Sequence, residues 1–333
     1  MPANVGEMFY YGETPWHGLG VEVGAPLSVQ EALRKGSLDW EVGTVKLQTL
    51  DKPPSPVPNR QAIVRLDRLP GSQDRVLGVV HLGFKPVQNR DAAMLLDTIF
   101  GRGKPVYHTG GYLGHGEMVW LLAKIDKQLV VGAGDIVEPY ALMANSHDGS
   151  RALTISLTTV RVVCENTLNL ALRKRGIGPR FWRSHHGTIE DHTGAAETFF
   201  ASFVSELDNV ASTFQRLAHK KCRDWQFSAL VAKLFRDPAR PLNADQNPTV
   251  RKAYETRMAS IQEARRKILE LRVAGRGADL PSARGTFWGA LNAITEFVDH
   301  HQKMPSDRLA YALLGDGQEL KMRAYREILK LAG

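Results

Sequence analysis

The sequence predicts an α+β fold: an antiparallel sheet body with a β-β-β-α core, followed by a mostly helical C-terminal region. Short alternating segments separated by turn residues occupy the first half of the chain. From Thr193 onward, apolar residues instead recur at every third or fourth position. The 333 residues, 43% of them hydrophobic, can form a sizeable core. We therefore expect an α+β body at residues 1–190 and a helical region at residues 191–333 packed on it.

A short helix and three strands are expected to form the core of the body. Ser28 and Glu31 match a capping box, serine at the N-cap and glutamate at the third helical position, which opens a helix to about Lys35. The proline-rich segment 51–58 should stay outside any central ladder, because proline has no backbone donor. The remaining elements of the core are strands at residues 40–50, 61–66 and 75–84 and a helix capped by Asn89 that runs to about residue 100.

Further strands should complete the body. Residues 107–113 and 117–125 flank a glycine-rich turn and predict a hairpin. Two more strands are expected at 136–144 and 152–164, and a short helix should follow from Glu165 or Asn166 to about Arg175. The helical region should hold one long amphipathic helix from about residue 193, a second around residues 254–271, a third around 287–298 and a terminal helix at 320–331. Trp288 should pack that region against the body.

Positive charge is unevenly distributed along the chain. The net charge is +8. Residues 151–186 hold seven Lys/Arg against one Asp/Glu, and residues 251–276 hold eight against three. A concentrated basic field favours an anionic partner, and nucleic acid is the commonest one. The alternative is a solvated basic surface.

Cations and aromatic rings alternate after the last expected strand. Arg180 and Arg183 flank Phe181 and Trp182, which suits single-stranded nucleic acid because cations meet phosphates and rings stack on bases. In the other interpretation, the basic residues are stabilised by the dipole at the C-terminus of a helix, and both rings are buried. The candidate nucleic-acid-binding residues are Arg151, Arg161, Arg173, Lys174, Arg175, Arg180, Trp182, Arg183, Arg251 and Lys252.

Some of these candidates have structural alternatives of their own. Arg161 ends a mostly apolar strand row, where a buried arginine paired with a carboxylate is the alternative to a phosphate contact. Arg251, Arg265 and Arg272 lie at seven-residue multiples along one expected helix. Because glutamates interleave with them, the pattern favours ion pairs on the helix surface over a nucleic-acid track.

An enzymatic alternative rests on polar side chains near the middle of the chain. His147, Asp148, Glu165 and His185 have the chemistry of divalent-metal ligands in a nuclease or other hydrolase. Their spacing matches no established motif, and the sequence holds no phosphate-binding loop or dinucleotide fingerprint. The sequence therefore favours a non-enzymatic protein with neither cofactor nor metal.

Composition also predicts the compartment. The chain contains two cysteines, too few for a disulfide framework. Its first residues lack the basic and apolar regions of a secretory signal, and no run of about 18 apolar residues occurs. We therefore expect a cytoplasmic protein that does not enter a membrane.

Several motifs together resemble the phage/plasmid-like proteins, a family of unknown function carried on mobile elements. They lie at residues 14–20, 110–116, 145–150, 160–172 and 285–300, together with the histidines that follow Phe181. The resemblance implies a mobile-element context and no particular reaction. The order of elements over residues 28–100 is also similar to the core of the Rad-fifty-two-type single-strand annealing proteins, a likeness of topology alone.

Charge and resemblance together lead to a functional hypothesis. We expect a nucleic-acid-binding protein of a phage or plasmid that binds single-stranded DNA and anneals it in recombination, as a homo-oligomer for which a ring is one form. A metal-dependent nuclease or other hydrolase is the first alternative. A protein that binds a host factor through its helical region is the second.

Overall fold

The structure is a computed structural model that describes residues 4–12, 20–99, 106–161, 166–169, 180–183, 193–302, 311–312 and 315–333. Its strands are β1 (Val5–Tyr11), β2 (Val21–Val23), β3 (Val42–Gln48), β4 (Pro56–Arg65), β5 (Val76–His81), β6 (Val106–Leu113), β7 (Met118–Lys124), β8 (Leu129–Gly132), β9 (Asp135–Ser146), β10 (Leu153–Arg161), β11 (Asn166–Asn169) and β12 (Arg180–Arg183). Its helices are α1 (Val29–Lys35), α2 (Asn89–Ile99), α3 (Thr193–His219), α4 (Asp224–Leu234), α5 (Pro248–Ala274), α6 (Phe287–Glu296), the π-helical turn η2 (Phe297–His301) and α8 (Asp316–Ala332). The α+β class is confirmed.

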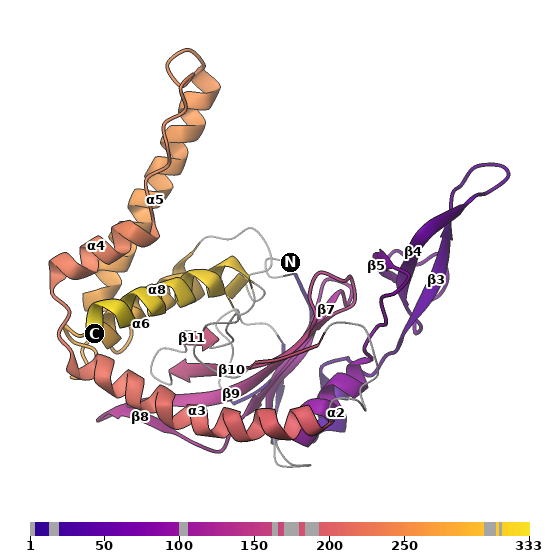
Figure 1. Ribbon diagram of the computed structural model, residues 1–333, viewed down its shortest axis with the longest axis horizontal. Helices are drawn as coiled ribbons and strands as arrows, with labels where there is room; N and C mark the ends of the chain where they lie inside the picture. The colour runs from indigo at the N-terminus through magenta and orange to yellow at the C-terminus, as the bar shows by residue number, and fades with distance from the viewer. Residues whose placement is uncertain are drawn as a thin grey trace.

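The body is built on one large sheet. Its strand order is β11-β10-β9-β7-β6-β1-β2, with β8 also paired to β9 and β12 to β10. Its pairings are antiparallel except that of β1 with β2, which is parallel. Figure 1 shows α3 running along this sheet, with α6 and α8 on the side of β10 and β11. The helical region meets this sheet along its outer strands: α3 contacts β8 and β12, and α6 and α8 contact β11.

The expected β-β-β-α core is present as a second sheet. Strands β3, β4 and β5 pair antiparallel in that order, with α1 before them and α2 after them. The capping box is confirmed, since Ser28 accepts from the amide of Glu31 while the Glu31 carboxylate accepts from the backbone of Ser28. The hairpin of β3 and β4 projects away from the large sheet (Figure 1).

The last prolines of residues 51–58 lie within a strand but outside a central ladder. Strand β4 begins at Pro56, which pairs with Gln48 of β3, so the last residues of the segment do join a ladder. The ladder between β4 and β5 begins only at Arg60. Pro56 and Pro58 therefore lie where β4 has a neighbour on one side only, and the missing donors of proline interrupt no central ladder.

The expected helix after β10 is wrong. Residues 166–169 form strand β11, which pairs antiparallel with Thr158–Arg161 of β10. Strand β12 pairs with the first part of β10, so the two short strands together follow the outer side of β10. Backbone groups along β10 need partners, and satisfying them outweighs the helix preference of a four-residue segment.

Trp288 joins the helical region to the body, as predicted. Its indole Nε1 donates to Asp135 Oδ2 of β9 at 2.9 Å, and its ring lies 4.7 Å from that of Phe214 on α3. Ser282 also donates to Asp135, at 2.5 Å. One continuous set of buried apolar side chains includes residues of both the sheet and the helices.

Helix α5 is the most exposed element of the helical region. Its buried residues are Ile268 and Leu271, both near its C-terminal end, and its first turns extend away from the body (Figure 1). None of the described helices combines the length and the apolar character that a bilayer span requires.

Candidate anion-binding pocket

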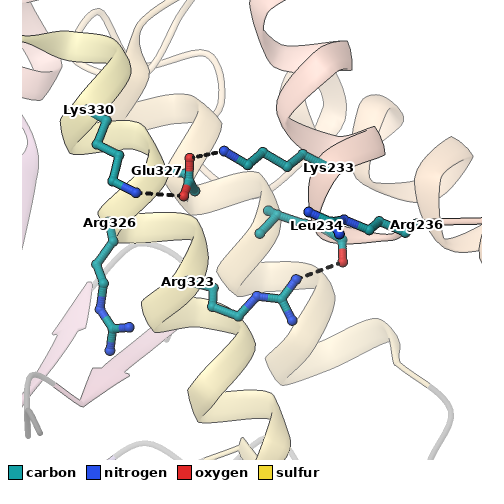
Figure 2. Close-up of a pocket in the computed structure, with 7 residues that line it drawn as sticks. All are labelled: Lys233, Leu234, Arg236, Arg323, Arg326, Glu327 and Lys330. Atoms are coloured by element: carbon teal, nitrogen blue, oxygen red, sulfur yellow. Dashed lines mark hydrogen bonds and ion pairs between the residues drawn. The ribbon is translucent and has the colours of Figure 1, made fainter.

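A pocket of about 470 Å³ lies between α4 and α8. Figure 2 shows side chains from the two helices facing each other across it. Five of its seven lining residues are Lys or Arg, and one is a carboxylate. The lining consists of Lys233, Leu234, Arg236, Arg323, Arg326, Glu327 and Lys330.

The face of α8 follows directly from helical spacing. Arg323, Arg326 and Lys330 are three and four residues apart, which places them on one side of the helix. Tyr325 and Ile328 lie on the opposite side and are fully buried. Burial of that apolar side directs the basic side of α8 toward the pocket.

Helix α4 is held by its own apolar side. Phe227, Leu230 and Val231 are buried, whereas Lys233 and Arg236, at and just beyond the end of the helix, are exposed. The backbone carbonyl of Leu234 accepts a hydrogen bond from Arg323 at 3.2 Å, which ties the end of α4 to α8. The cations of α4 thus stand opposite those of α8.

Glu327 connects the two helices. Its Oε2 lies 2.5 Å from Lys233 Nζ of α4, and its Oε1 lies 2.9 Å from Lys330 Nζ of α8. These hydrogen bonds, that of Lys233 first, lower the pKa of Glu327 below its usual value. The carboxylate is therefore ionised at neutral pH.

Two cations of the pocket are uncompensated. Arg236 and Arg326 make no hydrogen bond or ion pair with any residue of the part of the chain that the structure describes. Guanidinium groups bind phosphate and carboxylate oxygens through paired donors. A positive surplus with free guanidinium donors suits a phosphate-bearing ligand.

The sequence-predicted cations of the body that the structure describes lie in the turn before β10, in β10 itself and in β12, which pairs with it. Arg151 is exposed in the turn before β10. In β12, Arg183 is opposite Leu153 of β10 and Trp182 is opposite Thr154, and Arg180 begins the same strand. The structure places the backbones of these β12 residues and of Arg161, while Arg173, Lys174 and Arg175 lie outside the described residues.

This side of the sheet meets α8. Strand β11 contacts α8, and Asn166 of β11 is opposite Arg161 of β10. Strand β11 therefore lies between the end of β10 and α8, the helix that carries Arg326.

The predicted cations of α5 are not part of this region. Arg251 and Lys252 are exposed in the first turn of α5, at the end that extends from the body. Further along the helix, Arg266 lies 2.7 Å from Glu263 and 3.2 Å from Glu270. Arg266 thus makes ion pairs on the helix surface. Arg265 and Arg272, on which that expectation rested, instead pair with carboxylates outside α5: Arg265 lies 2.9 Å from Asp237 and Arg272 lies 3.6 Å from Asp224.

The structure describes only two of the four candidate metal ligands of the enzymatic alternative. His147 is fully buried, and its Nε2 lies 2.8 Å from Asn89 Oδ1. Asp148 accepts from the backbone amide of Ser150 in a turn. Glu165 and His185 lie outside the described residues, among which no group of three or more His, Cys, Asp or Glu side chains is placed to hold a metal ion.

Asn89 explains the position of His147. Asn89 was expected as an N-cap, but it is the first residue of α2, and its Nδ2 donates to the carbonyl of Leu38 at 3.1 Å. Its Oδ1 is therefore the acceptor, so His147 Nε2 donates to it. The imidazole also lies 5.4 Å from the ring of Trp40, which makes it part of the junction between the two sheets.

Arg65 closes the same junction. Its guanidinium lies 4.2 Å from the ring of Trp40 and donates to the carbonyl of His115 at 2.8 Å and to Asp67 through two nitrogens. At Gly116, φ is +119° and a Cβ would lie 2.8 Å from the Trp40 ring. The glycine-rich turn thus lets the second sheet dock closely, a structural task.

Sequence reasoning missed the pocket. The spacing of Arg323, Arg326 and Lys330 was visible, but a basic helix side is usually just solvated. Helix α4 was also not predicted. Only the tertiary structure places its Lys233 across from that side.

One family model matches the chain. It is described as a domain of unknown function (DUF932) and covers residues 76–326, which include α4 and the part of α8 up to Arg326 but neither Trp40 nor Arg65 of the junction. No curated protein and no solved structure matches. The expected membership of a family of unknown function is confirmed, and the chain belongs to the DUF932 family.

Proposed function

We propose that the protein binds single-stranded nucleic acid through the pocket between α4 and α8. The supporting observation is the excess of cations there, with Arg236 and Arg326 uncompensated. Neutralising strand phosphates releases condensed counterions, which drives binding without regard to sequence. The overall charge of +8 adds long-range attraction.

An exposed tryptophan favours a single strand over a duplex. Trp225 is 65% exposed on α4, eight residues before Lys233. The ring is on the same helix as Lys233, and an exposed aromatic ring can stack on an unpaired base. Bases in a duplex are already stacked and do not offer this face.

Salt-dependent binding tests the proposal. Fluorescence anisotropy with a labelled single strand should give an affinity that falls steeply with salt. Arg326→Ala should weaken binding and reduce the slope of log K against log salt by about 0.7, the value for one lost phosphate contact on a single strand. Lys46→Gln, at an exposed site on β3, is the matched control and should leave both unchanged. Absence of salt-sensitive binding by the unmodified protein would refute the proposal.

Stacking has its own test. Trp225→Ala should weaken binding of a single strand by about 1–3 kcal/mol, the contribution of one stacked base. The same change should leave the salt slope unaltered, because it removes no charge. A duplex of the same sequence should show no loss on this substitution.

The biological setting is part of the proposal. Resemblance to phage/plasmid-like proteins suggests strand annealing during recombination of a mobile element, with several copies holding one strand. Annealing of complementary strands followed by fluorescence quenching, together with mass photometry, tests this. A monomer that holds DNA without accelerating annealing would restrict the function to binding.

A further inference from the structure

We infer that the pocket between α4 and α8 receives the phosphorylated end of a nucleic-acid strand, a phosphomonoester. This inference rests on the proposed function and names the part of the strand that enters the pocket.

Glu327 marks a position for an anion between the two helices. Its two oxygens are divided between Lys233 and Lys330, one on each side of the pocket. The protein therefore already holds a negatively charged, oxygen-bearing group at this place. A phosphate oxygen offers these lysines the same kind of acceptor.

The positive charge of the five Lys and Arg residues in the pocket exceeds the single negative charge of Glu327. Arg236 and Arg326 keep all their donors for a ligand, and Arg323 gives one bond to the Leu234 carbonyl. An internal phosphodiester carries a single charge. A phosphomonoester carries about −1.5 to −2 charges and three acceptor oxygens at neutral pH, and so satisfies the surplus better.

The lining of the pocket lacks most types of side chain that recognise bases. None of its seven residues is aromatic, and none carries a hydroxyl or amide side chain. Recognition inside the pocket therefore rests on charge and on the geometry of phosphate oxygens. Its volume of about 470 Å³ is in the range of pockets that bind one small molecule, which suits a terminal nucleotide with its phosphate.

The test compares three short single strands of one sequence: 5′-phosphorylated, 3′-phosphorylated and unphosphorylated. One phosphorylated strand should bind about tenfold more tightly than the unphosphorylated strand, as one or two added charge-assisted hydrogen bonds would provide. Arg236→Ala and Arg326→Ala should abolish this preference. Lys46→Gln should preserve it.

The variant Glu327→Gln tests the inference independently. It removes the internal anion and frees both lysines, so it should increase the preference for the phosphorylated strand. Circular dichroism confirms that each variant is folded before binding is compared.

The outcomes separate the two claims. Equal, salt-sensitive binding of all three strands overturns this inference and leaves the proposed function standing. No binding of any strand overturns the proposed function as well. A phosphate preference that survives both arginine substitutions places the end site elsewhere and also overturns the inference.

Discussion

Lys321 and Asp299 form a buried ion pair inside the helical region. Lys321 Nζ lies 2.6 Å from Asp299 Oδ1, and the two side chains are 0% and 2% exposed. The pair links α8 to the π-helical turn η2. Because α8 also carries the basic side of the pocket, this contact helps to hold the pocket's wall in place.

Removing one member of this pair should destabilise the protein strongly. Asp299→Ala leaves the buried ammonium of Lys321 without its carboxylate, and the free energy of unfolding should fall by about 3–5 kcal/mol. Urea denaturation followed by circular dichroism measures it. The double variant Asp299→Leu with Lys321→Met should recover most of the loss, since no charge is then buried. A double variant as unstable as the single one would contradict this account.

The Asp135 contacts should couple the sheet to the helices. Asp135→Ala removes the acceptor of both Trp288 and Ser282, and we expect a loss of about 2–3 kcal/mol in the free energy of unfolding. Residues 1–190 and 191–333 share one core, so thermal unfolding should remain a single transition in the unmodified protein. Two separate calorimetric transitions would show that the two parts fold independently.

Arg65 should be irreplaceable by lysine. Lysine retains the charge but lacks the fork that binds Asp67 and the plane that covers the Trp40 ring. Arg65→Lys should lower the free energy of unfolding by about 2 kcal/mol in urea denaturation. Arg60→Lys, on an exposed position of the same strand, should change it by less than about 0.5 kcal/mol.

Alkaline pH should reduce stability through Tyr107. Burial raises the pKa of this phenol above its usual value of 10.0, and the nearby Asp97 raises it further. Above pH 10 the unfolded chain therefore loses the proton before the folded protein does, and stability falls as pH rises. Tyr107→Phe should make this decline shallower in denaturation experiments between neutral pH and pH 11. An unchanged slope would contradict the assignment.

Local patterns in the sequence predicted much of the fold. The capping box at Ser28, the alternation of β3 to β7, β9 and β10 and the three-to-four spacing in α3 and α6 depend on neighbours along the chain, so they are visible in the sequence. The strand β11 was not visible. Whether Asn166–Asn169 is helix or strand depends on the backbone groups of β10, which the sequence around that segment does not contain.

The sequence by itself determined the fold class, the overall positive charge and the basic side of α8. It did not determine where that side points. Only the tertiary structure placed Lys233 and Arg236 across from Arg326 and paired Arg265 of α5 with Asp237. The physical reason is that a charge acts according to its neighbours in space: paired with a carboxylate it is compensated, and gathered with other cations it attracts an anion.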